Sequence, residues 1–166
     1  MKSLILGYGN RGRRDDGVGW FVVEQLEALG LPDTDFDTRQ QLEIELAETL
    51  APYDRVIFVD AATPEAPAAV EHRPVVPRFQ SHSLSHCLSP DELVGLCDSL
   101  FGRAPAAVLF SIRGRDFGFG DQLSAQTKHS ALEVVRQIAE LLLPHPNQPN
   151  RPAASNVECD HLPRSR

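Results

Sequence analysis

Residues 4–19 read LILGYGNRGRRDDGVG, and this stretch decides the fold. Its apolar start, residues 4–6, runs into a glycine turn, which is typical of a buried strand that leads into a loop. From Val18 to Leu29 apolar residues recur at helical spacing, and a glycine followed by a proline ends the pattern directly afterwards. The stretch therefore predicts a strand, a glycine-rich loop and a helix.

Later segments continue this alternation of strands and helices. Leucines spaced four apart in residues 42–50 predict a helix, and the unbroken apolar run 56–59 predicts a parallel strand covered on both faces. Residues 89–92, SPDE, combine a serine cap, a proline and a glutamate as at the start of a helix. A strand over 107–112 and a helix over 131–142 follow. We expect a single-domain α/β fold: a mostly parallel twisted sheet flanked by helices on both faces.

The domain is expected to span residues 1–143. Residues 144–166 contain five prolines and no apolar period, so this segment is predicted to be a mobile tail. Residues 62–80 are also rich in proline, but they join two clear elements and predict an irregular edge strand.

Charge and apolar content exclude several classes of partner. The 166 residues carry a net charge of -7, which disfavours a general affinity for nucleic acid or for an anionic membrane. No apolar run approaches the roughly 20 residues that cross a bilayer, and no signal-peptide core is present. We therefore expect a cytoplasmic protein. Its cysteines, Cys87, Cys97 and Cys159, lack the spacing of a disulfide framework or a thiolate zinc site.

Three polar clusters follow predicted strands, where this architecture places ligands. Asp15 and Asp16 lie in the glycine loop, Asp60 follows the strand over 56–59, and His82 and His86 precede the serine cap. Two carboxylates and an imidazole form an O,O,N set that suits a divalent transition metal with open positions. A metal held in this way polarises a carbonyl or activates water.

Simpler structural roles are open for each of these residues. Asp15 or Asp16 could cap the following helix, and we expect one of them to do so. Asp60 could hydrogen-bond loop amides, and a histidine is often satisfied by one hydrogen bond. The residue types alone leave both the metal site and these structural roles open.

The order and spacing of the clusters resemble those of the hydrogenase maturation endopeptidases, which trim the C-terminus of the large subunit of nickel-iron hydrogenases. The resemblance covers most of residues 3–143 and implies a compact α/β fold. Its motifs are LGYGN at 6–10, DDGVG at 15–19, YDRVIFVDAA at 53–62, SHCLSPDEL at 85–93, Phe101-Gly102, FGFG at 117–120 and Leu123-Ser124.

This resemblance implies a nickel-binding site formed by Asp16, Asp60 and His86. It further implies that the nickel arrives already bound in the large-subunit precursor, so the protease recognises a finished metal site before it cuts. His86 is preferred because its spacing to the following Ser-Pro pair matches the family, while His82 lies four residues earlier. Both histidines stay candidates for the ligand.

Three other functions compete with this one. A non-catalytic assembly factor could check the loaded precursor without cutting it. Gly7, Gly9 and Gly12 match the dinucleotide-binding fingerprint, with aspartates at 33, 35 and 37 for the ribose, but the paired acids in the loop would repel a pyrophosphate. Cys87 could act as a nucleophile with a histidine base. We expect its thiol instead to be a small buried apolar group.

Overall fold

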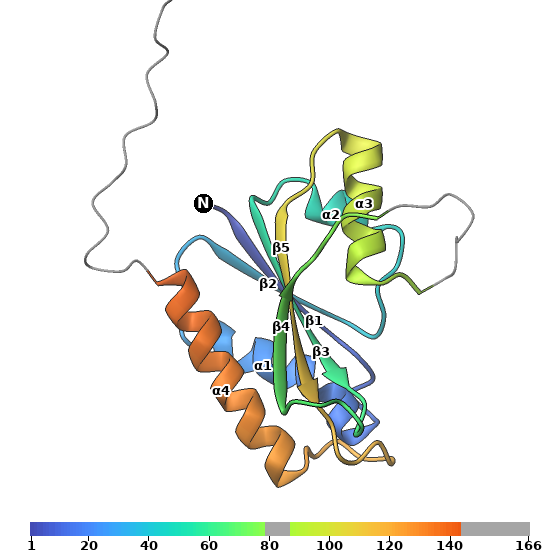
Figure 1. Cartoon of the computed structure of the whole chain (residues 1–166). Helices are drawn as coiled ribbons and strands as arrows, with labels where there is room; N and C mark the ends of the chain where they lie inside the picture. Colours follow the sequence, from blue (N-terminus) through green and yellow to red (C-terminus); the bar gives the residue numbers. More distant parts are fainter. Residues whose placement is uncertain (79–86, 144–166) are drawn as a thin grey trace, which may run out of the picture.

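The computed structural model of the chain describes residues 1–78 and 87–143, in which five strands form one sheet (Figure 1). The strand order is β2-β1-β3-β5-β4, and only β4 runs antiparallel to its neighbour. The elements are β1 Ser3–Tyr8, the 3₁₀ turn η1 Arg14–Gly17, α1 Val18–Glu27, β2 Thr34–Arg39, α2 Leu46–Leu50, β3 Arg55–Ala62, β4 Val70–Pro74, α3 Pro90–Phe101, β5 Ala106–Arg113 and α4 Ala125–Leu142. The predicted α/β fold class is confirmed.

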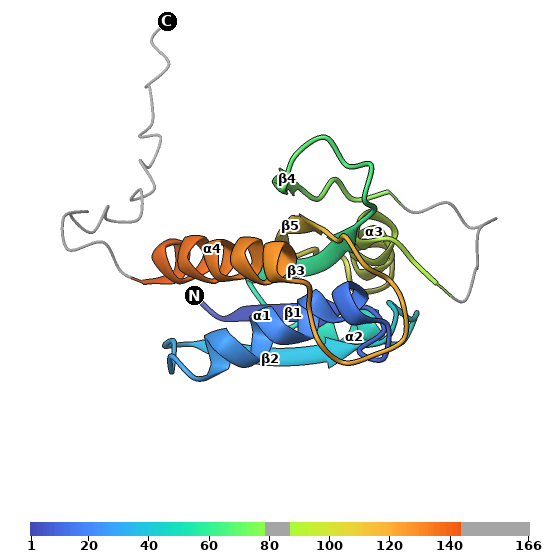
Figure 2. The ribbon, with the colours of Figure 1, turned by 90° about the horizontal axis from the view of Figure 1, so that it is seen from below.

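Helices cover both faces of the sheet, with α1 and α4 on one side and α2 and α3 on the other (Figure 2). The strands supply both layers because successive side chains point to opposite faces. In β1, for example, Leu4 and Leu6 pack with α2 and α3, while Ile5 packs with α1 and α4. The unbroken apolar runs of the central strands are therefore explained by burial on two sides.

Close backbone contact fixes the start of α1 against the ends of β1 and β3. A Cβ atom at Gly19 would lie 2.6 Å from the carbonyl oxygen of Val59 and 2.8 Å from the amide nitrogen of Tyr8. A Cβ atom at Gly7 would lie 2.2 Å from the carbonyl oxygen of Gly19. Only glycine fits at these two positions. The contact brings η1, which precedes α1, to the carboxyl ends of both strands.

Local sequence signals located some elements well and missed others. The serine cap is confirmed, since the Ser89 hydroxyl accepts from the Glu92 amide and the Glu92 carboxylate accepts from the Ser89 amide. The irregular edge strand is β4. The helix expected over 42–50 is shorter, beginning at Leu46. The sequence analysis missed β2, an edge strand without an apolar run, and the expected tail, 144–166, lies outside the described residues.

Replacing Gly19 with alanine is expected to lower the free energy of unfolding by about 3 kcal/mol, because the added methyl group meets backbone atoms of two strands. Urea unfolding followed by circular dichroism measures the change. Gly12→Ala is the control: its Cβ would meet only the Asn10 side chain, at 3.3 Å, and the expected change is within about 0.5 kcal/mol. Equal stability of the two variants would contradict the packing argument.

Candidate active site

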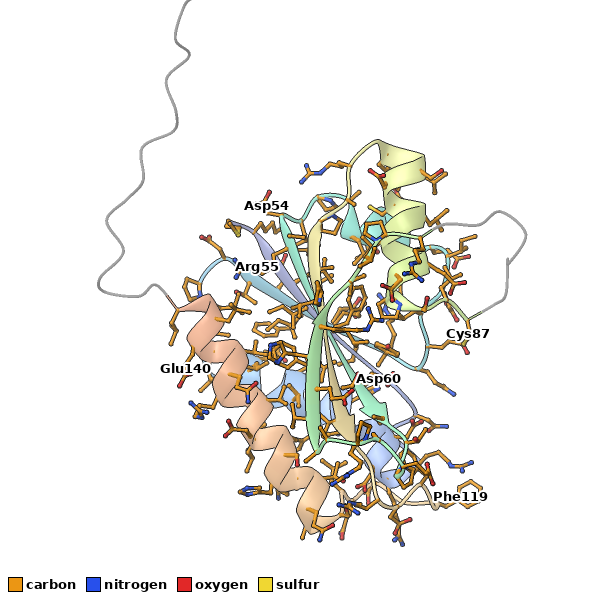
Figure 3. All side chains as sticks on the ribbon, viewed as in Figure 1. Asp54, Arg55, Asp60, Cys87, Phe119 and Glu140 are labelled. Atoms are coloured by element: carbon orange, nitrogen blue, oxygen red, sulfur yellow. The ribbon has the colours of Figure 1, made fainter. Side chains whose placement is uncertain are left out.

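Asp16 and Asp60 lie at the same edge of the sheet, one in η1 and the other near the end of β3. A backbone hydrogen bond restrains each carboxylate. The Asn10 amide donates to Oδ2 of Asp16 at 2.8 Å, and the Ala61 amide donates to Oδ1 of Asp60 at 2.8 Å. Both side chains are partly buried. Figure 3 shows Asp60 near the end of β3, the same end of the sheet at which the glycine loop follows β1.

The environment of Asp60 disfavours its charged form. Burial and, to a smaller extent, the negative charge of Asp16 raise the pKa of its carboxyl to about 6, against the lowering effect of hydrogen bonds from Tyr8 and the Ala61 amide. The two carboxylates are therefore close enough to interact. A carboxyl group with a pKa near neutrality is suited to accept and return a proton.

Tyr8 is a third member of this site, and the sequence analysis gave it no role. It ends β1 next to β3, where the register pairs Gly7 with Val59 and so brings Tyr8 beside Asp60. Burial, together with the charge and the hydrogen bond of Asp60, raises the pKa of the Tyr8 phenol well above its usual range. The phenol therefore stays protonated and donates to the carboxylate. The rule that parallel strands end at one edge, applied to β1 as well as β3, would have found it.

An ion pair between β4 and α3 borders the same site. Arg73 binds Asp91 through two nitrogen–oxygen contacts of 3.0 and 2.6 Å, and the Val76 amide donates to Oδ1 of Asp91 at 2.8 Å. The hydrogen bonds and charge of Arg73 hold the pKa of Asp91 below its usual range, against the opposing effect of burial. Tyr8 is within electrostatic reach of both charges. The pair thus ties the start of α3 to the edge strand beside the carboxylates.

Asp15, the neighbour of Asp16, is fully buried and holds two distant segments together. It accepts backbone hydrogen bonds from Arg115, Asp116 and Ser124 at 2.7 to 3.0 Å. It also accepts from the hydroxyl groups of Ser124 and Thr127 at 2.7 and 2.9 Å. The expected helix cap is wrong: the N-cap residue of α1 is Gly17, and no side chain caps η1 or α1.

Five hydrogen-bond donors make the charged form of Asp15 the stable one. Burial by itself raises the pKa of this carboxyl, but the amides of Arg115, Ser124 and Asp116 and the Ser124 hydroxyl outweigh it, so the net shift is downward. Adjacent aspartates therefore have opposite roles. Both oxygens of Asp15 are engaged in internal hydrogen bonds, whereas Asp16 accepts one hydrogen bond, from the Asn10 amide, among the described residues.

The two candidate histidines, His82 and His86, lie outside the described residues. Among residues 1–78 and 87–143, no group of three metal-ligating side chains is present. The predicted ligand set of Asp16, Asp60 and His86 therefore stays a prediction. The described donors are of a type that suits a divalent metal, because two carboxylates lie within electrostatic reach of each other at this edge.

Cys87 is exposed, so the expectation that its thiol is a buried apolar group is wrong. Its Sγ atom lies 3.1 Å from Oε1 of Gln41. Cys87 lies outside the strands, shortly before α3. Figure 3 shows its thiol apart from Asp60.

Internal packing and backbone conformation explain Gly9, in the loop between β1 and η1. A Cβ atom at Gly9, whose φ is +130°, would lie 2.0 Å from the carbonyl oxygen of Asp16. The chain's own backbone thus occupies the space that a bound phosphate would need beside this glycine. Asp35 and Asp37 on β2 are engaged as well, with Tyr53 and Arg39 respectively. The geometry gives no support to dinucleotide binding.

Several solved structures with a similar fold are named hydrogenase maturation proteases. The nickel-iron (NiFe) hydrogenase maturation protease HycI of Thermococcus kodakarensis KOD1 is 25% identical, with a TM-score of 0.66 over 85% of this chain and 92% of that one. HybD of Thermococcus kodakarensis is 20% identical, with a TM-score of 0.64 over 86% and 100%. The hydrogenase maturating endopeptidase HybD of E. coli is 23% identical, with a TM-score of 0.64 over 86% and 92%. No family model and no curated protein sequence matches the chain significantly.

These neighbours confirm the resemblance to the hydrogenase maturation endopeptidases that the motifs predict. They support peptidase as the class of enzyme. Within the part of the chain that the structure describes, no helix combines the length and the apolar character of a membrane span.

Asp15→Asn is expected to lower the free energy of unfolding by about 3 kcal/mol near neutral pH, because the amide group places a donor against backbone N–H groups. Since folding lowers the pKa of Asp15, its stabilisation is present above the pKa of the unfolded chain and is lost as the pH falls. The deficit should therefore shrink in acid. Urea unfolding at two pH values measures it, with the exposed Asp98→Asn as control. A pH-independent deficit would contradict this account.

Asp60→Asn is expected to stabilise the fold. Folding raises the pKa of Asp60 from 3.8 to about 6, so the native state favours the protonated carboxyl, and its charged form costs stability as the pH rises through that range. Removing the charge should add about 1–2 kcal/mol near pH 8 and much less near pH 4. Thermal and urea unfolding at both pH values measure the gain. Destabilisation near pH 8 would show that this burial carries no electrostatic cost.

Proposed function

We propose that the chain is an endopeptidase that removes a C-terminal extension from the nickel-loaded precursor of a hydrogenase large subunit. The convergence of Asp16 and Asp60 at the carboxyl end of the parallel strands is the observation that supports it best. The fold it shares with maturation proteases adds to this support. A cytoplasmic location is part of the proposal, because the precursor would be processed there.

Nickel enters this proposal as part of the substrate. Bound in the precursor, the ion would keep open positions for one oxygen of Asp16, one oxygen of Asp60 and a nitrogen of His86, with His82 as the alternative. Neither carboxylate is neutralised by a lysine or arginine among the described residues, so both are available to a cation. A precursor without nickel would lack this contact. Recognition of the metal would thus restrict cutting to finished metal sites.

Hydrolysis requires a water molecule and a base beside the scissile peptide. In the proposed reaction, water attacks the carbonyl carbon while a carboxylate accepts its proton, and the proton then passes to the leaving amine as the carbon–nitrogen bond breaks. Asp16 and Asp60 are the candidates for this role, since both carboxylates lie at the strand ends where the precursor would bind. Tyr8, by donating to Asp60, would hold the carboxylate in one orientation.

Asp16→Asn, Asp60→Asn and His86→Ala are each expected to lower the rate of precursor cleavage at least about a hundredfold, because each removes a contact to the metal or the base. Mass spectrometry of purified precursor, incubated with and without nickel, measures the released peptide. Asp98→Asn, on the exposed face of α3, is the matched control and should cleave like the wild type.

Three outcomes would count against the proposal. Wild-type cleavage by all three variants would show that these side chains are not the site. Equal cleavage of nickel-free and nickel-loaded precursor would remove the recognition role of the metal. A wild-type protein that binds the loaded precursor tightly but releases no peptide would instead be a non-catalytic assembly factor.

A further inference from the structure

Phe119 is the most exposed large apolar side chain of the described residues, with 85% of its surface accessible. It lies in the segment between β5 and α4, residues 114–124, and Figure 3 shows its ring projecting from the molecule at the end where Asp60 lies. An isolated exposed apolar residue needs no explanation by itself. The surroundings of this ring distinguish it from the others.

The segment that carries Phe119 is held rigidly against the glycine loop. Nε of Arg13 donates to the carbonyl of Phe117 at 2.9 Å, and Nε of Arg14 donates to the carbonyl of Phe119 at 3.2 Å. The Arg14 amide donates to the Gly120 carbonyl at 2.9 Å, and the Asp15 carboxylate accepts from the Arg115 amide of the same segment. The backbone that carries the ring is therefore held in place, which lowers the entropy cost of binding a partner.

The Arg13 guanidinium stacks on the exposed ring, with its central carbon 5.1 Å from the ring centroid. Arg13 forms no ion pair with an aspartate or glutamate of the described residues, although the chain as a whole carries an excess of acids. Aromatic rings and arginines are both enriched in protein interfaces, and here the two lie together on the surface.

The position of this pair links it to the candidate active site. Arg13 lies three residues before Asp16, in the loop that also delivers that carboxylate. A cleft of about 390 Å³ borders the neighbouring Arg14 and Gly17, and its other lining residues include the apolar Trp20, Phe21 and Leu123, the cations Arg11 and Lys128 and the acids Glu24 and Asp121. Apolar and charged side chains thus lie on the surface next to the turn that carries Asp16. A substrate protein bound at Asp16 would cover this area.

We propose that Arg13 and Phe119, here named the Phe119 surface, dock the precursor protein, with the ring in an apolar pocket of the precursor and Arg13 on a carboxylate at its rim. The inference rests on the proposed function. A second copy of this chain fits less well, because a two-fold interface centred on this surface would bring the two Arg13 cations together. The Phe119 surface supplies binding energy and takes no part in bond cleavage.

Phe119→Ala is expected to raise KM for the nickel-loaded precursor at least tenfold and to leave kcat unchanged, because it removes contacts equal in the ground and transition states. Arg13→Gln should raise KM less than Phe119→Ala does, and its effect on KM should be smaller at high salt because the charge is screened. The matched control is Phe101→Ala, at the end of α3, where the ring is 45% exposed. Cleavage kinetics of full-length variants, with thermal unfolding as the test of folding, measure these effects.

Distinct results separate the failure of this inference from the failure of the proposed function. If the wild type cleaves the precursor and Phe119→Ala has an unchanged KM, the Phe119 surface is not the docking site, while the endopeptidase function stands. If Phe119→Ala dissociates a wild-type dimer in sedimentation experiments, the occupant is a second copy and the inference is overturned. If the wild type cleaves no precursor, the proposed function and the docking inference both fail.

Discussion

The buried carboxylate of Asp15 is the interaction on which this end of the molecule depends. It joins η1 to the amides of Arg115 and Asp116, a hundred residues later in the chain, and to the first turn of α4. A charge with no water around it is stable only when donors surround it, and here five donors do so. The same bonds hold Asp16 at the strand ends and keep the segment of Phe119 in place.

Close packing and electrostatics act in opposite directions at this site. Gly7 and Gly19 let α1 touch two strands, which brings Asp16 toward Asp60. That proximity, together with burial, disfavours the charge on Asp60 and lowers the stability of the fold at neutral pH. The hydrogen bonds of Asp15 and the Arg73–Asp91 ion pair stabilise the surrounding backbone and so offset this cost. The repulsion between Asp16 and Asp60 marks the position where a bound cation would stabilise both charges.

Sequence reasoning located the features that depend on neighbouring residues. The strand over 56–59, the cap at Ser89 and the placement of Asp16 and Asp60 at one edge all follow from local patterns and from the parallel sheet. The partners of Asp15 could not be found in this way, because they are distant in the chain and most are backbone amides. β2 has no apolar run to reveal it, because it is an edge strand. Its Asp35 pairs with Lys2 and accepts a hydrogen bond from Tyr53. Tyr8 was hidden because tyrosine at a strand end is ordinarily a packing residue.

The two edges of the sheet bear on how partners approach. β2 carries Asp35, Asp37 and Arg39, and β4 carries Glu71, Arg73 and Pro74, so charge and a missing amide hydrogen interrupt both outer rows of backbone groups. Such edges resist the addition of a foreign strand and so guard against fibril-like stacking. A polypeptide partner would therefore gain little by adding a strand to either edge, so side-chain contacts elsewhere on the surface would have to determine how it binds.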